Sequence, residues 1–364
     1  MKKEAGSVTS ALHALLARAI AREGGWLPFD RYMALALYAP GLGYYSRGSR
    51  KFGAMPASGS DFVTAPELTP LFGRALARQL AQALEVTGTT EVWEFGAGSG
   101  ALAAQLLEAL GSAVESYTIV ELSASLRERQ QERLRAHAAK VRWVDGLPDR
   151  IDGVLVGNEV LDAMPVKLLQ RTNGAWHERG VTADGLRLAF ADRPTDLRPP
   201  VGIAGSHDYL TEIHPQALAF IRTLAERLHK GAAFFIDYGF PEAEYWHAQR
   251  HMGTLMCHRG HLADADPLQD PGEKDITAHV DFTGVAVVAQ ESGLRVLGYT
   301  SQARFLFDCG ILELAVVASL AERAALQKLV NEHEMGELFK VIGLARGEFW
   351  DAIGFRTSDR TSRL

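Results

Sequence analysis

Hydrophobic and polar residues follow two different rhythms along this chain, and the change falls near residue 90. Before it, apolar positions recur at helical spacing over residues 8–38, with a break at Gly24-Gly25, and again over 64–84. A loop-rich stretch, residues 38–62, separates the two, and loops of this length are often functional. The pattern predicts that residues 1–88 are largely helical and contain this loop.

From residue 90 onward, short apolar runs alternate with amphipathic segments. Such alternation indicates βαβ units and an open parallel sheet, so the predicted fold class is α/β with its core over residues 89–364. Turn signals at Asn173-Gly174 and Asp184-Gly185 predict an antiparallel insertion over 167–200, and residues 241–280 read as a polar, His-rich loop insertion. The strands are predicted at 91–95, 116–122, 141–146, 151–160, 232–239, 294–300 and 339–346, and the helices at 101–110, 123–138, 215–231, 281–293 and 305–332.

Composition narrows the class of protein only slightly. The 364 residues are 47% hydrophobic, which is enough for a packed core, and no apolar run is long enough to span a membrane. The formal net charge of −6 gives no electrostatic footprint for nucleic acid. With two cysteines, a disulfide framework is not expected and a cytoplasmic location is predicted.

A glycine-rich loop joins the first predicted strand of the sheet to the helix that follows. Its glycines occupy alternate positions and an acid precedes them. Open α/β sheets bind ligands at this edge, where glycines let backbone N–H groups approach the ligand and the helix N-terminus adds partial positive charge. The predicted cofactor-binding residues of the loop are Glu94, Phe95, Gly96, Ala97, Gly98, Ser99 and Gly100.

The spacing and charge of this loop favour one class of cofactor. It reads G-x-G-x-G after an acid, whereas dinucleotide binders have G-x-G-x-x-G. Glu94 would repel a pyrophosphate but could pair with an ammonium, while backbone N–H groups could bind a carboxylate. S-adenosyl-L-methionine, with S-adenosyl-L-homocysteine as its product, carries both groups. A serine-hydrolase elbow is excluded because Ser99 lacks a glycine two residues earlier.

Acids also end the next two predicted strands. Glu121 lies about 20 residues beyond the last glycine, where a carboxylate can accept hydrogen bonds from ribose hydroxyls. Asp145 follows the third strand and could meet the exocyclic amine of adenine. Leu122 and Gly146, the residues after these acids, complete the predicted cofactor site. The alternative is that the acids are solvated strand ends and the glycines form only a tight turn.

Specific sequence blocks lie along almost the whole chain: "GYYSR" (43–47), "DFVTAPELTPLFG" (61–73), "EFGAGSG" (94–100), "NEVLDAMPV" (158–166), "IDYG" (236–239), "GTL" (253–255), "RGH" (259–261) and "DITAHVDF" (275–282). Together they resemble one family, the MidA-type (DUF185, COG1565-type) methyltransferases that use S-adenosyl-L-methionine. The resemblance implies a class I methyltransferase fold, with a seven-stranded sheet whose last strand is antiparallel, inserted segments, and an N-terminal helical cap with a cofactor-covering loop over residues 1–88. Mitochondrial members of the family methylate a protein arginine and assist the assembly of respiratory complex I.

Candidate catalytic residues follow from this resemblance. Methyl transfer is an in-line displacement, for which an enzyme aligns the nucleophile and excludes water, and paired carboxylates suit an arginine. Asn158 and Glu159 are predicted to line the junction of cofactor and substrate, with Glu159 or Asp162 binding the substrate cation. His279 could take the proton. Alternatively, Asp162 caps the turn before Pro165, Asn158 fixes a loop and His279 is only packed.

Residues 61–67 are predicted to close over the cofactor through Thr64, although Thr64 and Glu67 also read as a helix capping box. Asp281 could instead begin the following helix, and the residues near 260 could form contacts within their own loop. The predicted substrate-binding residues are Glu67, Arg259, His261 and Asp281.

No metal site is expected, since the spacing of His247, His251, Cys257, His258 and His261 matches no standard zinc site. The favoured function is a methyltransferase that uses S-adenosyl-L-methionine and acts on a protein arginine. By the family resemblance, a respiratory-complex subunit is the expected partner. The alternative is a non-catalytic assembly factor that retains the cofactor-binding core, and a nicotinamide oxidoreductase is disfavoured by the glycine spacing.

Overall fold

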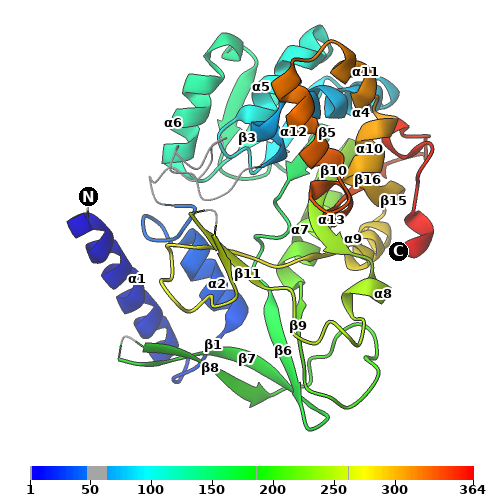
Figure 1. Ribbon diagram of the computed structural model, residues 1–364. Helices are drawn as coiled ribbons and strands as arrows, with labels where there is room; N and C mark the ends of the chain where they lie inside the picture. The colour runs from blue at the N-terminus through cyan, green and yellow to red at the C-terminus, as the bar shows by residue number, and fades with distance from the viewer. Residues whose placement is uncertain (1, 47–63, 186, 261) are drawn as a thin grey trace. The chain divides into compact units, whose positions relative to one another are not determined.

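The computed structural model describes residues 2–46, 64–185, 187–260 and 262–364. Its chain divides into two compact units, and neither is a continuous stretch of sequence (Figure 1). Unit 1 comprises Met1–Ser49, Leu161–Ala219 and Glu242–Asp281, and unit 2 comprises Arg50–Val160, Phe220–Pro241 and Phe282–Leu364.

Unit 2 is built on a twisted sheet in which seven strands follow one hydrogen-bonded path, β15-β16-β10-β5-β2-β3-β4 (Figure 1). Strands β10, β5, β2, β3 and β4 run parallel, and β16 is antiparallel to both β10 and β15. This is the predicted α/β sheet with an antiparallel last strand. The strands are β2 (Glu91–Phe95), β3 (Ser116–Val120), β4 (Val141–Val144), β5 (Ile151–Asn158), β10 (Leu228–Phe240), β15 (Arg295–Ser301) and β16 (Phe339–Arg346).

Helices pack against this sheet because its strands are apolar on both faces, as expected for buried parallel strands. Val154 and Val156 of β5 join the core cluster that α4 and α5 complete, whereas Phe235 of β10 meets the ring of Phe220. The helices of unit 2 are α3 (Ala65–Leu68), α4 (Pro70–Thr87), α5 (Ala101–Leu110), α6 (Ala124–Arg133), α9 (Phe282–Glu291), α10 (Gln302–Asp308), α11 (Ile311–Val316), α12 (Leu320–Val330) and α13 (Met335–Leu338), with short 3-10 turns at Gly111–Ala113, Arg135–His137, Ile353–Phe355 and Thr361–Arg363.

The single helix predicted over 64–84 is two helices, α3 and α4. The chain breaks at Thr69 because Pro70 forces the preceding residue into an extended conformation, here φ −161° and ψ 143°. Pro70 then occupies the first turn of α4, and the Thr69 hydroxyl accepts a hydrogen bond from Leu71 N at 3.3 Å. The capping-box interpretation is wrong, since the Thr64 side chain makes no cap hydrogen bond.

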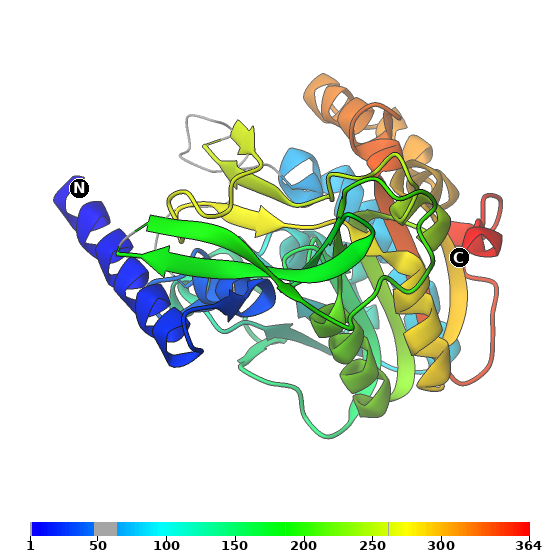
Figure 2. The ribbon, with the colours of Figure 1, turned by 90° about the horizontal axis from the view of Figure 1, so that it is seen from below.

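Unit 1 contains two antiparallel sheets and the N-terminal helices. One sheet has the order β1-β7-β6-β9 with β8 on the other side of β7, and the second has the order β12-β11-β13. Figure 2 shows β7 and β8 as a long hairpin ribbon beside α2. The elements are α1 (Lys2–Arg22), β1 (Leu27–Pro28), α2 (Phe29–Tyr38), β6 (Lys167–Thr172), β7 (Ala175–Asp184), β8 (Arg187–Pro194), β9 (Tyr209–Ile213), α8 (Glu242–Tyr245), β11 (Met256–Arg259), β12 (Leu262–Asp264), β13 (Asp275–Thr277) and β14 (Val280–Asp281), while α7 (Pro215–Arg227) begins in unit 1 and continues in unit 2.

The antiparallel strands predicted for this part of the chain are present, and so is the first predicted turn. Asn173 and Gly174 have φ values of 50° and 78°, the left-handed pair that a tight two-residue hairpin requires. The prediction of a loop over residues 241–280 is wrong, because this range contains α8 and the three-stranded sheet β12-β11-β13. Its strands are too short for a clear alternation, and Cys257 is the fully buried position of β11.

Both cysteines are buried free thiols, Cys257 in unit 1 and Cys309 in unit 2. Burial raises the pKa of the Cys257 thiol to about 12 and that of Cys309 further. No helix in the described part of the chain is both long and apolar enough to cross a bilayer.

Candidate functional site

The glycine loop of unit 2 connects the end of β2 to the start of α5 in a conformation that side chains resist. Gly96, Gly98 and Gly100 have φ values of 63°, 53° and 81°, in the left-handed region that favours glycine. Gly96 is also tightly enclosed, since a Cβ there would lie 2.9 Å from Cγ2 of Val160. Successive backbone N–H groups at a helix N-terminus form a concavity for an anion, such as a carboxylate.

Glu94 lies in β2 just before this loop, with 2% of its surface exposed. The hydroxyl of Tyr117, on β3, donates a hydrogen bond to Glu94 Oε2 at 2.6 Å. Burial raises the pKa of Glu94 to about 7, against the opposing effect of the Tyr117 hydrogen bond. Near neutral pH the carboxyl is therefore close to half-ionised, and an ammonium placed beside it would favour the charged form.

Glu121 follows β3 and is tied to the glycine loop through one amide. Its carboxylate accepts hydrogen bonds from Ser123 N at 2.8 Å and from Gln130 Nε2 at 3.1 Å, while burial raises its pKa. The same Gln130 amide group also donates to Gly98 O at 3.0 Å. The sequence analysis missed Gln130. Its only signal is an amide in a polar helix, and nothing local shows that this position is fully buried.

The other residues predicted for the nucleoside end lie at the surface of unit 2. Leu122 exposes 76% of its surface directly after Glu121, which leaves an apolar face where a planar ring could stack. Asp145 and Gly146 follow β4 and are exposed, as predicted for residues beyond the carboxyl end of a strand.

The turn after β5 holds Asn158 and Glu159. Asn158 is buried, and its Nδ2 donates to Glu159 Oε1 at 2.9 Å. Within the described residues, Asn158 Oδ1 is buried without a hydrogen-bond donor. Glu159 has φ 55°, a conformation that costs a non-glycine residue about 1–3 kcal/mol and often marks functional sites.

These features of unit 2 fit the groups of S-adenosyl-L-methionine. A buried acceptor without a donor, Asn158 Oδ1, suits an ammonium, which has hydrogen atoms to donate. The glycine loop offers N–H groups to a carboxylate, and Glu121 offers a carboxylate to ribose hydroxyls. Glu94, the glycine loop, Glu121, Asn158 and Glu159 would hold the cofactor.

Helix α3 carries Glu67 toward the glycine loop. The Glu67 carboxylate accepts hydrogen bonds from Ser99 Oγ and from Arg133 Nη1, the latter at 2.9 Å. Thr64 precedes α3 and is partly buried. Both residues thus belong to the cofactor half of the molecule, and a direct contact of Glu67 with substrate stays a prediction.

In unit 1, Asp162 is buried near a second acid. Its backbone oxygen accepts a hydrogen bond from Ala278 N at 3.0 Å, in the segment that follows Asp275. Burial raises the pKa of the Tyr38 hydroxyl well above its usual range, and the charges of Asp275 and Asp162 add to this effect. Two buried carboxylates therefore lie near one phenol, a setting that suits a cation.

His279 and Asp281 lie near a hydrogen-bonded network of unit 1 that joins Thr254, Tyr245 and His214. His279 N donates to Thr254 Oγ1 at 3.0 Å. Burial lowers the pKa of His214 to about 4, and the nearby His279 adds to this effect. Asp281 is buried. It lies near enough to Tyr245 that its charge adds to the effect of burial, which raises the pKa of the Tyr245 hydroxyl.

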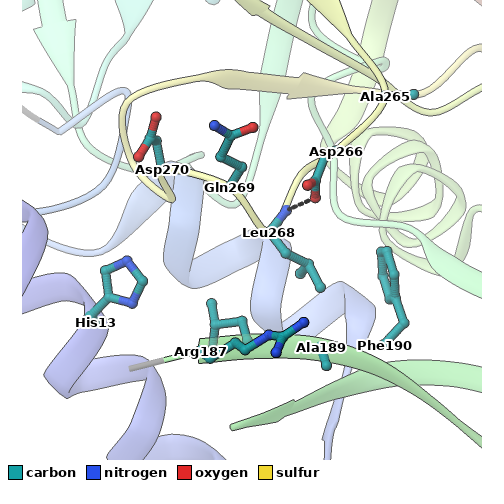
Figure 3. A pocket seen from close by; sticks show the side chains of 10 residues that line it. His13, Arg187, Ala189, Phe190, Ala265, Asp266, Leu268, Gln269 and Asp270 are labelled. Atoms are coloured by element: carbon teal, nitrogen blue, oxygen red, sulfur yellow. Dashed lines mark hydrogen bonds between the residues drawn. The ribbon is translucent and has the colours of Figure 1, made fainter. Parts of the chain in front are cut away.

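Arg259, predicted to bind substrate, makes contacts within its own loop. Its guanidinium meets Asp270 at 3.2 Å and Glu273 at 3.9 Å, as the alternative interpretation expected. Asp270 also lines a cavity of about 600 Å³ in unit 1, together with His13 and Arg187 (Figure 3). His261 falls outside the described residues. Within the described part of the chain, no three His, Cys, Asp or Glu side chains are close enough to hold a metal.

The strand order and the left-handed glycine loop, with acids at the ends of successive strands, define a class I methyltransferase fold. The chain belongs to the Methyltransf_28 family, described as "Putative S-adenosyl-L-methionine-dependent methyltransferase", whose family model matches residues 75–300. The predicted family, fold class and cofactor are thereby confirmed.

Solved structures and characterised relatives agree with this assignment. A COG1565 superfamily member from Burkholderia thailandensis, crystallised with S-adenosyl-homocysteine, is 50% identical to the chain and superposes with a TM-score of 0.96 over 99% of this chain and 98% of that one. The mitochondrial protein arginine methyltransferase NDUFAF7 of Danio rerio is 28% identical over 88% of this chain and 85% of its own length. The Homo sapiens protein of that name is 27% identical over 88% and 80%.

Proposed function

We propose that the protein transfers the methyl group of S-adenosyl-L-methionine to an arginine side chain of a protein. The observation that carries the cofactor half is the buried Asn158 Oδ1, which has no donor among the described residues and lies beside the strained Glu159 at the end of β5. The arginine half draws support from the NDUFAF7 relatives, which are protein arginine methyltransferases.

The chemistry asks little of the protein beyond alignment. The bound cofactor supplies an electrophilic methyl group on a sulfonium. A guanidinium nitrogen forms the new C–N bond while the C–S bond breaks and its electron pair stays on sulfur, and the nitrogen releases one proton. We assign Glu159 to hold the guanidinium, since a carboxylate can bind its planar fork through two hydrogen bonds.

Residues of unit 1 are assigned to the acceptor side. The buried Asp162 offers negative charge to a cationic side chain, and His279 would take the released proton. Asp281, also of unit 1, and Glu67, of unit 2, are proposed to support acceptor binding. The acceptor protein itself is proposed to meet the enzyme in the cytoplasm, and a respiratory-complex subunit is the first candidate to test.

The cofactor assignment is tested by calorimetry of the full chain with S-adenosyl-L-methionine, S-adenosyl-L-homocysteine and NAD. We expect micromolar binding of the first two and none of NAD, and a Kd weaker than about 1 mM for both would contradict the proposal. Asn158→Ala should weaken binding at least tenfold. Asn331→Ala is the matched control, because Asn331 accepts a hydrogen bond from His333 N at the end of α12, in the same unit.

The acceptor is tested by adding the protein and radiolabelled cofactor to a lysate that lacks it. We expect a labelled protein band whose mass spectrum places the methyl group on arginine, and Glu159→Ala should abolish the label while Asn331→Ala keeps it. Tight binding of S-adenosyl-L-homocysteine without any labelled protein would instead favour the non-catalytic assembly factor.

A further inference from the structure

The turn that carries Asn158 and Glu159 is held to the neighbouring strand by a side chain as well as by the backbone. Strands β5 and β10 pair in parallel up to Asn158 and Ile236, and Glu159 N continues this ladder by donating to Ile236 O at 2.9 Å. The next N–H, of Val160, donates to a side chain, Asp237 Oδ2, at 3.0 Å. The Asp237 carboxylate therefore ends the ladder where the backbone turns away.

Asp237 is placed to hold this turn rigidly. It is 1% exposed, and its second oxygen, Oδ1, accepts a hydrogen bond from Tyr238 N at 3.0 Å. Both carboxylate oxygens thus accept from main-chain N–H groups, one in the turn after β5 and one in β10. A buried acceptor held at two points defines the position of the groups bonded to it.

Val160 links the turn to the glycine loop. A Cβ on Gly96 would lie 2.9 Å from Val160 Cγ2, and one on Gly157 would lie 3.4 Å from the same atom. The Val160 methyl therefore fills the space beside Gly96 and shares the space beside Gly157 with the ring of Phe235, which would lie 2.9 Å from a Cβ there. A shift of the Val160 backbone would displace this methyl group and so disturb the packing between the turn and the glycine loop.

We propose that Asp237 is a positioning residue for the methionine end of the cofactor site, an inference that rests on the proposed function. By holding Val160 N, Asp237 keeps Glu159 in its left-handed conformation and keeps Asn158 aimed at the cofactor ammonium. Without that bond, the turn relaxes toward the conformations that glutamate prefers, and the two side chains leave their positions.

This role predicts that loss of the Asp237 carboxylate weakens binding of the methionine end of the cofactor and leaves binding of its adenosine end unchanged. Glu121 and Leu122, which are proposed to hold the adenosine end, follow β3, and the Glu121 carboxylate is held by Ser123 N and Gln130 Nε2 rather than by a residue of the turn after β5. Asp237→Ala should weaken S-adenosyl-L-homocysteine at least tenfold in calorimetry of the full chain. The same variant should bind 5′-methylthioadenosine, which lacks the amino-acid group, within twofold of wild type.

The matched control is Asp308→Ala in the same unit. Asp308 also fixes backbone, accepting from Thr357 N at 3.0 Å, but it lies near the C-terminal segment. Asp308→Ala should leave both affinities within twofold while lowering the unfolding temperature. If Asp237→Ala does not fold, Asp237→Asn, which keeps one acceptor oxygen, should show the same selectivity with a smaller loss.

Three outcomes decide the matter. Selective weakening of S-adenosyl-L-homocysteine supports the inference. Equal weakening of both ligands, or unchanged binding by a folded Asp237 variant, overturns it and leaves a structural role only. Failure of the wild-type chain to bind S-adenosyl-L-homocysteine at all would overturn the proposed function, and this inference with it.

Discussion

Two buried glutamates, one in each unit, meet very different surroundings. Glu94 of unit 2 is 2% exposed and accepts one hydrogen bond from a described residue, from Tyr117. Glu212 of unit 1 is fully buried and accepts four: from Tyr245 Oη at 3.1 Å, Thr254 N at 2.9 Å, Thr254 Oγ1 at 3.0 Å and Leu255 N at 3.1 Å. Equal burial thus accompanies unequal hydrogen bonding.

The difference indicates what each carboxylate is for. Four donors replace the water that Glu212 loses on burial, so this group organises the fold around "GTL" (253–255). Gly253 is part of the same arrangement, because a Cβ there would lie 2.5 Å from Glu212 Oε1. At Glu94 one described donor replaces the water that is lost on burial. This suits a carboxylate that gains its remaining hydrogen bonds when a ligand binds.

The largest loss of stability should follow the substitution of Glu212 by glutamine. An amide NH₂ replaces one carboxylate oxygen and faces two donors, so Glu212→Gln should lower the free energy of unfolding by about 2–4 kcal/mol. Glu94→Gln should leave it equal or raise it at pH 8, because a neutral amide avoids burying a charge. Urea unfolding gives the free energy of unfolding of both variants. A larger loss in Glu94→Gln than in Glu212→Gln would contradict the proposed difference between the two carboxylates.

The next largest effect should be a change in the free energy of unfolding with pH, caused by the titration of Glu94. Burial raises its pKa to about 7 in the folded chain from an ordinary value of 4.5, so the folded state holds the proton between these pH values while the unfolded state releases it. The free energy of unfolding should therefore fall as pH rises from about 4.5 to 7, by about 3 kcal/mol at about 1.4 kcal/mol per pKa unit.

Comparison with Glu94→Gln isolates this contribution, because the variant lacks the titrating group. The difference in unfolding free energy between the two proteins should vary across that pH range and level off above it. A constant difference from pH 5 to 8 would show that Glu94 does not titrate there.

A smaller effect should separate two left-handed glycines of unit 2. Gly96 and Gly88 have φ values of 63° and 56°, but a Cβ at Gly88 would meet only the flexible end of Lys230, 3.4 Å from Nζ. Gly88→Ala should cost about 1–2 kcal/mol from backbone strain alone. Gly96→Ala should cost more, because it also contacts Val160, and it alone should weaken S-adenosyl-L-homocysteine in calorimetry. Equal losses of affinity would contradict the assignment of the glycine loop.

Local sequence patterns were sufficient to predict the sheet of unit 2 and the position of its glycine loop. Periodicity places strands and helices, and the ends of parallel strands meet at one edge, so Glu94, Glu121 and Asn158 could be placed together. Partners brought together by tertiary packing could not be predicted. Gln130 reaches Gly98, and Glu67 reaches Arg133, across 32 and 66 residues of sequence.

The same limit explains the errors. A proline after Thr69 divided a helix that hydrophobic periodicity alone would continue, and the short strands of residues 256–277 have too few alternations to be recognised. The left-handed conformation of Glu159 gave no sequence signal either, since glutamate is not a residue that favours it.

The two buried thiols offer a way to follow each half of the molecule separately. Cys257 belongs to unit 1 and Cys309 to unit 2, and burial suppresses the thiolate form of both. An alkylating reagent can therefore react only when the surrounding structure opens. The rates of modification at these two natural reporters, read by peptide mass, would time the opening of each unit without any engineered label.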